Sequence, residues 1–307
     1  MVKKERLLYS KYEFDTLVIL GESYNCKTLL LFDRRINMKE KKMLVLDIDG
    51  TVTNSKKEIT KHTLDAILAC QKAGHIVVIA SGRPTPGVVK IANTIELEKY
   101  GGYVLSFNGA RITKWDTKEI IYQQTLNADI CKKVYKYCLE HDLGMLTYDE
   151  VGALTGTRID EYMEFEARIN NIDITQYGEH FVDIVDFPVC KFLLTKEDKE
   201  AEIHEKVLQE ELADCASVYR SEPFFIEIMA KGIDKAASLE KLRQVVGMDV
   251  ENIIACGDGF NDLSMIRYAG LGVAMANAQQ TVKDGADYIT TSNDEDGVAK
   301  VIEEFIL

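Results

Sequence analysis

The fold of this chain is decided by one stretch of sequence, Met43-Leu44-Val45-Leu46-Asp47-Ile48-Asp49-Gly50-Thr51. Its first four residues are apolar and predict a short buried strand. Asp47 and Asp49 follow the strand two residues apart, so their side chains point the same way. In doubly wound α/β folds, ligands bind at the carboxyl edge of the sheet, where both carboxylates would lie. Gly50 allows a sharp turn there, although Asp-Gly is also a common turn dipeptide without any catalytic role.

From Met43 onward, strand-like and helix-like segments alternate. Short continuous apolar runs are typical of strands that are buried on both faces of a parallel sheet. The predicted strands are Met43–Leu46, Ile76–Ala80, Tyr103–Phe107, Asn252–Cys256, Leu271–Ala274 and Ala286–Thr290, and the predicted helices include Thr63–Gly74, one that begins at Pro84, Asp234–Val246 and Asp294–Phe305. This pattern predicts an α/β fold with a Rossmann-like, doubly wound parallel sheet as its core.

The middle of the chain has a different rhythm, which predicts an inserted α+β cap domain over residues 126–224. Its predicted elements are the helices Asn127–His141, Ile159–Ile169 and Lys196–Leu212 and the strands Cys190–Leu194, Ser217–Tyr219 and Phe224–Ile228. The catalytic core would then consist of two segments, 43–125 and 225–307.

Residues 1–42 form an N-terminal extension of uncertain status. Their net charge is +4, whereas the rest of the chain carries −17. One interpretation is an extra strand or helix that packs on the core. The alternative hypothesis is that translation begins at Met38 or Met43, and an intact mass of the protein from its native host would decide between them.

Two further polar clusters follow or precede predicted elements. Ser81-Gly82-Arg83-Pro84 comes directly after the strand Ile76–Ala80, and a hydroxyl and an amide ahead of a helix form a small anion cradle. Arg83 either assists there or only makes a surface ion pair. Lys235 begins the helix Asp234–Val246, where its ammonium can meet a phosphate or can simply be solvated.

A fourth cluster, Gly257-Asp258-Gly259-Phe260-Asn261-Asp262, follows the strand Asn252–Cys256. Asp258 is a candidate metal ligand. Asn261 and Asp262 open the next helix, and a helix cap alone would explain one of them, although not all three polar groups. The carboxyl ends of parallel strands share one edge of the sheet, so we expect these clusters to converge on a single active site.

The four clusters resemble, in order and in structural context, the four motifs of the haloacid dehalogenase superfamily of phosphohydrolases. The insert, the pattern Gly-Asp-Gly-x-Asn-Asp and the segment Ser106-Phe107-Asn108-Gly109-Ala110 are similar to its Cof-type subfamily. The resemblance covers residues 43–307 and leaves 1–42 without a counterpart. It implies a Mg²⁺-dependent phosphatase that forms an aspartyl-phosphate intermediate, with the insert as the cap that selects the substrate.

The resemblance also implies a role for each site residue. Asp47 would be the nucleophile and Asp49 the general acid/base. Mg²⁺ would be held by Asp47, by Asp49 through its backbone carbonyl, and by Asp258, with Asp262 behind it, orienting the metal waters or Lys235; the phosphoryl group would be held by Ser81, Gly82, Lys235 and Asn261. Sugar phosphates, flavin mononucleotide and pyridoxal phosphate are the candidate substrates that it implies.

Other functions remain as alternatives at this stage. A phosphomutase uses the same nucleophile but passes the phosphoryl group to a sugar hydroxyl. A dehalogenase fits less well, because the acid Asp49 and a magnesium set suit phosphoryl chemistry. A phospholigand-binding regulator without turnover would be expected to lack Asp47, Asp49 or Lys235, all of which are present.

The composition indicates which partners and which cellular compartment to expect. The net charge of −13 argues against a nucleic-acid partner but not against a small phosphorylated metabolite. No apolar run approaches the ~18 residues that a membrane span needs, so no membrane partner is expected. The chain has seven Cys without a Cys-x-x-Cys pair, which predicts buried thiols in a reducing cytoplasm. The sequence does not indicate an oligomeric state.

Overall fold

The computed structural model describes residues 16–19, 22–25 and 40–307. The chain divides into two units, residues 1–41 and 42–307. In the first unit, strands β1 (Thr16–Ile19) and β2 (Glu22–Asn25) pair in antiparallel fashion. The sequence showed no sustained strand period here, so this pairing was missed. Met38 and one of the seven cysteines, Cys26, lie outside the described residues.

The second unit contains an eight-stranded sheet in the order β16-β15-β14-β3-β4-β5-β6-β7. Its strands are β3 (Met43–Leu46), β4 (Ile76–Ala80), β5 (Tyr103–Ser106), β6 (Arg111–Lys114), β7 (Glu119–Gln123), β14 (Ile253–Gly257), β15 (Leu271–Ala274) and β16 (Tyr288–Ile289). The strand that precedes Asp47, β3, lies between β14 and β4 and runs parallel to both. The carboxyl ends of these three strands therefore meet at one edge, as predicted.

The sheet is not parallel throughout. β6 pairs with β5, and β7 with β6, in antiparallel fashion. Neither strand was predicted from the sequence. In both strands, polar and charged residues are interspersed with apolar ones, as is common near the edge of a sheet. Neither strand therefore forms the continuous apolar run that marked the buried strands. The α/β fold with a predominantly parallel central sheet is confirmed, with this antiparallel extension as a correction.

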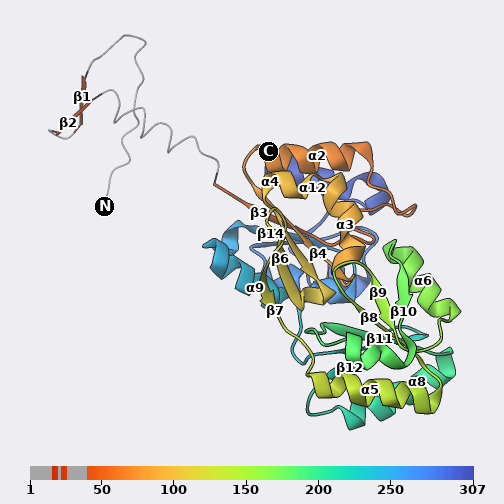
Figure 1. Ribbon diagram of the computed structural model, residues 1–307. Helices are drawn as coiled ribbons and strands as arrows, with labels where there is room; N and C mark the ends of the chain where they lie inside the picture. Colours follow the sequence, from red (N-terminus) through yellow and green to blue (C-terminus); the bar gives the residue numbers. More distant parts are fainter. Residues whose placement is uncertain (1–15, 20–21, 26–39) are drawn as a thin grey trace. The chain divides into compact units, whose positions relative to one another are not determined.

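Helices cover both faces of the sheet. Successive side chains of β3 point to opposite faces, so they contact different helices. Leu44 and Leu46 pack with α2, α3 and α12, whereas Met43 and Val45 pack with α9 and α10. In Figure 1, α2, α4 and α12 accordingly lie together, away from α9. The helices of this part are α2 (Lys61–Lys72), α3 (Thr85–Thr94), α4 (Leu97–Tyr100), α9 (Lys235–Val246), α10 (Leu263–Tyr268), α11 (Gln280–Lys283) and α12 (Gly297–Phe305).

The insert forms a second sheet of six strands in the order β10-β9-β8-β11-β13-β12. Its strands are β8 (Gly144–Tyr148), β9 (Ala153–Thr155), β10 (Ile174–Gln176), β11 (Lys191–Thr195), β12 (Ser217–Glu222) and β13 (Phe225–Met229), and its helices are α5 (Ala128–His141), α6 (Glu161–Asn170), α7 (Phe181–Ile184) and α8 (Asp198–Glu211). α5 and α8 cover one face of this sheet. The other face packs with Phe107 and Ala110 of the core. We call this part the cap.

The predicted division at residues 224 and 225 cuts through the cap sheet. β13 pairs with both β11 and β12, so Phe225–Met229 belongs to the cap. A strand that ends a domain and leads directly into the next helix carries no sequence mark of which sheet it joins. We therefore propose 126–229 as the cap, with 43–125 and 230–307 as the core.

Candidate active site

Asp47 follows β3 and lies at the centre of a buried cluster. Its side chain is 10% exposed, and Lys235 Nζ donates a hydrogen bond to Asp47 Oδ1 at 2.9 Å. The same ammonium donates to Asp262 Oδ1 at 2.5 Å and to the Ala80 carbonyl at 2.8 Å. Lys235 is the first residue of α9, whose N-terminus is capped by the Asp234 side chain. All three N–H donors of this buried lysine are thus used, and they join the ends of three elements.

The balance of charges in this cluster favours the binding of a further cation. Burial raises the pKa of Asp47 to about 8, and Asp262 and Asp258 add to this rise while Lys235 opposes it. Burial by itself lowers the pKa of Lys235, but the carboxylates of Asp262 and Asp47 outweigh it and hold this pKa above its usual value. Lys235 therefore stays charged and compensates only part of the surrounding negative charge.

Asp258 and Asp262 both come from the segment after β14, but their surroundings differ. Asp258 accepts a hydrogen bond from Thr51 Oγ1 at 2.8 Å, and burial raises its pKa to about 6. Asp262 Oδ2 accepts the backbone N–H groups of Asp258, at 3.0 Å, and Gly259, at 2.8 Å. With Lys235 on its other oxygen, Asp262 is tied into the protein and positions its neighbours.

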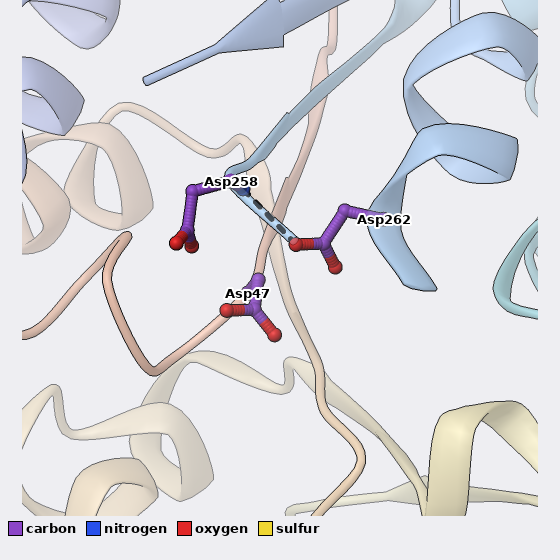
Figure 2. A group of neighbouring side chains, drawn as sticks. All are labelled: Asp47, Asp258 and Asp262. Carbon is purple, nitrogen blue, oxygen red and sulfur yellow. Dashed lines mark hydrogen bonds between the residues drawn. The ribbon is translucent and has the colours of Figure 1, made fainter. Parts of the chain in front are cut away.

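Carboxylate oxygens of Asp47, Asp258 and Asp262 lie within 4.8 Å of one another. Figure 2 shows the side chains of Asp47, Asp258 and Asp262 facing a common space. Gly50 makes room for this arrangement: its φ is +85°, and a Cβ there would overlap the Asp258 carboxylate. The donors are all oxygen, which hard divalent cations prefer. Burial and repulsion between the carboxylates raise the pKa values of Asp47 and Asp258, and a cation would relieve that repulsion. The residues present therefore fit a divalent metal.

The Asp49 carboxylate lies outside this metal cluster. It accepts hydrogen bonds from Arg83 Nε at 2.7 Å and Arg83 Nη2 at 2.8 Å, and one from Lys57 Nζ at 2.9 Å. Burial by itself raises the pKa of Asp49, but Arg83 and Lys57 outweigh it and lower this pKa. Any contact of Asp49 with a metal through its backbone carbonyl stays a prediction. The sequence left two roles open for Arg83, and in the structure it forms a bidentate ion pair with Asp49.

Ser81 and Gly82 follow β4 and lie next to Asn108, a residue that the sequence analysis quoted but did not assign to the site. The Asn108 N–H donates to the Ser81 carbonyl at 2.9 Å, and Asn261 Nδ2 donates to Asn108 Oδ1 at 3.0 Å. Asn108 has a φ of 54°, in the left-handed region that Asn tolerates. It therefore links the segment after β5 to those that carry Ser81 and Asn261.

These groups line one cavity of about 660 Å³, a size ordinary for small-molecule sites. The core contributes the predicted residues Asp47, Asp49, Ser81, Gly82, Asn261, Asp258 and Asp262 to its lining. Lys235 lies beneath Asp47, fully buried. The cavity thus brings together the predicted site residues of the core.

The cap lines the same cavity with residues that the sequence analysis missed, among them Glu166, Lys191 and Glu227. A signal for two of them was present. Lys191, the first residue of β11, interrupts the apolar run from Val189 to Leu194, and Glu227 interrupts the otherwise apolar strand β13. A charge in such a run is either on a solvated face or buried and paired, and the pattern alone does not tell which.

A buried carboxylate beside an all-oxygen cation site is what covalent phosphoryl transfer requires. Fold and site together define an α/β phosphohydrolase with a cap. Comparison with known proteins agrees, because residues 44–302 match the family model of haloacid dehalogenase-like hydrolases. The chain therefore belongs to this superfamily, as a Cof-type phosphohydrolase, and is a phosphomonoester hydrolase.

Individual relatives support this assignment. A 5-amino-6-(5-phospho-D-ribitylamino)uracil phosphatase, YcsE of Bacillus subtilis, is 32% identical over 268 residues, covering 87% of this chain and 96% of its own. The crystal structure of a haloacid dehalogenase-like hydrolase from Bacteroides thetaiotaomicron is 43% identical, with a TM-score of 0.84 over 87% of this chain and all of that one. The sugar phosphatase BT4131 is 25% identical, with a TM-score of 0.72 over 86% and 99% of the two chains.

Hydrolases of this superfamily generally use a divalent metal, in accord with the acidic cluster. Among the described residues, no helix has the length and apolar character needed to cross a membrane. Of the cysteines in this part of the chain, five are buried and free, and Cys215 is free and exposed.

Proposed function

We propose that this chain is a Mg²⁺-dependent phosphatase that hydrolyses small phosphorylated metabolites, sugar phosphates or similar phosphomonoesters, through an aspartyl phosphate on Asp47. One observation carries the proposal: Asp47 is buried, anchored by Lys235, and borders a cavity that it shares with Asp49 and Ser81. Relatives named as phosphatases of a phosphoribityl compound and of sugars support the substrate class.

In the first half-reaction, Asp47 would attack phosphorus in line while the bond from phosphorus to the leaving alcohol breaks. Asp49 would give the alcohol its proton. Lys235 would hold Asp47 in place, and Ser81, Gly82 and Asn261 would bind the phosphoryl oxygens. Mg²⁺ held by Asp47, Asp258 and the Asp49 carbonyl would neutralise the charge that phosphate brings to Asp47. The protein mainly supplies position and charge.

In the second half-reaction, Asp49 would take a proton from water as the water attacks the acyl phosphate and frees Asp47. This step needs an ionised Asp49. The hydrogen bonds from Arg83 and Lys57 favour that form, because they lower the pKa of Asp49. Donating a proton in the first half requires the opposite form, so we propose that substrate binding loosens the contact between Asp49 and Arg83.

The test is hydrolysis of a panel of phosphate monoesters, with magnesium and with chelator, by the wild type and by Asp47→Asn. The wild type should need magnesium, and Asp47→Asn should lose at least about 10³-fold in kcat, because Asn cannot form an acyl phosphate. Asp65→Asn, at an exposed position on α2, is the matched control and should keep full activity. Substantial turnover by Asp47→Asn would contradict the proposal.

A further inference from the structure

The cap contains three buried ionisable side chains that the proposed mechanism does not use. Lys191, Glu227 and Glu166 have exposed fractions of only 4%, 7% and 6%. In β11 and β13, side chains alternate between the two faces of the cap sheet. Phe192 and Ile226 pack beneath α5 and α8, so Lys191 and Glu227 lie on the opposite face, toward the core.

Two tyrosines on the same face complete two hydrogen-bonded groups, one of Lys191, Glu227 and Tyr219 and one of Glu166 and Tyr148, and we call these five residues together the cap polar cluster. Lys191 Nζ donates to Glu227 Oε1 at 3.2 Å, and the Tyr219 hydroxyl donates to Glu227 Oε2 at 3.0 Å. The Tyr148 hydroxyl donates to Glu166 Oε1 at 2.8 Å. Lys191 Nζ has three N–H donors, and among the described residues one of them is used.

Three members of this cluster, Glu166, Lys191 and Glu227, border the cavity that also contains Asp47 and Asp49. Core and cap charges also interact across this cavity, because Arg83 contributes to lowering the pKa of Glu166 against the rise that burial causes. The cluster therefore borders the cavity from the cap side, where the leaving alcohol of a phosphomonoester bound at Asp47 would lie.

A neighbouring group gives an independent sign that this wall accepts a polar ligand. Asn170 lines the cavity, is 4% exposed, and its Oδ1 has no hydrogen-bond partner. The same cavity is also lined by the aromatic side chains of Phe165 and Phe225, whose ring centroids lie 6.2 Å apart. Polar groups with free hydrogen-bonding capacity beside an aromatic surface suit a ligand with hydroxyls on a carbon skeleton.

Buried charges are costly to maintain, and an apolar pair of similar volume is often as stable. A cluster of this kind is therefore weak evidence for stability and better explained by recognition. A hydroxyl group both donates and accepts, so neighbouring hydroxyls can bond a carboxylate and an ammonium together. A leaving group without hydroxyls would displace water from this wall without satisfying the remaining hydrogen-bonding capacity of Lys191 and the two glutamates, which is unfavourable.

We propose that Glu166, Lys191 and Glu227 bind hydroxyl groups of the leaving alcohol and so select phosphomonoesters of polyhydroxylated alcohols, such as sugars and alditols. This inference rests on the proposed phosphatase function. It names the part of the cap that determines specificity, and it disfavours phosphomonoesters whose leaving alcohol is an alkyl or aryl group.

The test compares two substrates with six carbons each, sorbitol 6-phosphate and hexyl phosphate, which differ in their hydroxyl groups. The wild type should have the higher kcat/KM for sorbitol 6-phosphate. In Glu227→Gln, the ratio of the two kcat/KM values should fall about 10- to 100-fold, as expected for a lost hydrogen bond to a charged group. The double variant Lys191→Met/Glu227→Gln removes both charges and should lower the ratio of the two kcat/KM values at least as far.

Glu205→Gln is the matched control. Glu205 pairs with Arg220 Nε at 3.1 Å in the same domain but does not line the cavity, so the substrate ratio should stay at the wild-type value. An equal loss on both substrates in Glu227→Gln and in the double variant would overturn the inference, because it indicates a structural role only. A wild type that hydrolysed hexyl phosphate as well as sorbitol 6-phosphate would overturn the inference and leave the proposed function standing, whereas no turnover of any ester in the panel with magnesium present would remove the proposed function itself.

Discussion

The core and the cap each bury a group of charged side chains, and the two groups are built differently. In the core, Asp47 and Asp258 follow strands, and the Asp262 carboxylate is held by backbone N–H groups as well as by Lys235. In the cap, Lys191 and Glu227 lie within strands, whose backbone groups are occupied by the sheet.

This difference has a physical reason. At the end of a strand, backbone amides and the next helix are available to fix a carboxylate, so geometry there is set by the chain itself. Within a strand, a charged side chain depends on other side chains, and the group can change by substitution without disturbing the fold. We infer that the core cluster serves the reaction common to the superfamily and that the cap polar cluster serves the choice of substrate.

The largest expected effect separates the two clusters directly. Lys235→Met leaves Asp47 and Asp262 buried without their cation, so turnover of every substrate should fall by at least about 10²-fold, and stability should fall by about 3–5 kcal/mol. Lys191→Met should instead lower turnover unequally among substrates. Kinetics and denaturant unfolding measure both effects.

Lys132→Met, at an exposed position of α5, is the control for replacing a lysine and should change neither property. Equal loss of all substrates in both Lys235→Met and Lys191→Met would remove the distinction between the clusters.

A smaller effect concerns pH. Burial and Glu227 raise the pKa of Glu166, against Lys191, Tyr148 and Arg83. The folded protein thus keeps the Glu166 carboxyl protonated to a higher pH than the unfolded chain does. The stability that this proton contributes is present below the ordinary pKa of the carboxyl and is lost as the pH rises through the raised pKa of the folded state. As the pH rises above the ordinary pKa of a glutamate, about 4.3, the melting temperature of Glu166→Gln should fall less than that of the wild type.

Glu164→Gln provides the comparison for this measurement, since Glu164 lies exposed on the same helix, α6, and should follow the wild-type curve. Parallel curves for Glu166→Gln and the wild type would mean that Glu166 is already ionised in the folded cap.

The smallest effect tests the contact between core and cap. A Cβ on Gly87 in α3 would come within 2.5 Å of Asn170 Oδ1 in α6. A helical Gly→Ala change ordinarily stabilises by up to about 1 kcal/mol, but here the methyl group should separate α3 from α6. For Gly87→Ala we expect no gain in stability and a KM raised a few-fold. A Gly87→Ala variant that is more stable than the wild type and has an unchanged KM would show that α3 and α6 accommodate the methyl group without separating.

Much of the core was predictable from sequence, because its evidence is local. The strand Met43–Leu46 and the run Leu271–Ala274 were predicted at their observed bounds, since buried parallel strands are continuous apolar runs. The convergence of Asp47, Ser81 and Asp258 followed from the rule that the carboxyl ends of parallel strands share an edge. What was missed depends on pairing between distant segments.

β13 shows this limit, since its assignment to the cap depends on which strands it pairs with and not on its own residues. Glu166 shows it too: an acidic residue on a charged helix reads as solvated, and its burial results from the Tyr148 side chain and the surrounding cavity wall. The fixation of Asp49 by Arg83, 34 positions away, is equally a product of the fold.

The central claim is the aspartyl phosphate on Asp47, and trapping it is the most direct test. In Asp49→Asn supplied with p-nitrophenyl phosphate and magnesium, the first half-reaction needs no proton, because nitrophenolate leaves without one, whereas the second lacks its base. The intermediate should accumulate, and borohydride should reduce the acyl phosphate so that the peptide containing residue 47 carries homoserine there. Trapping at another carboxylate, or nitrophenolate release with no modified residue 47, would contradict the account.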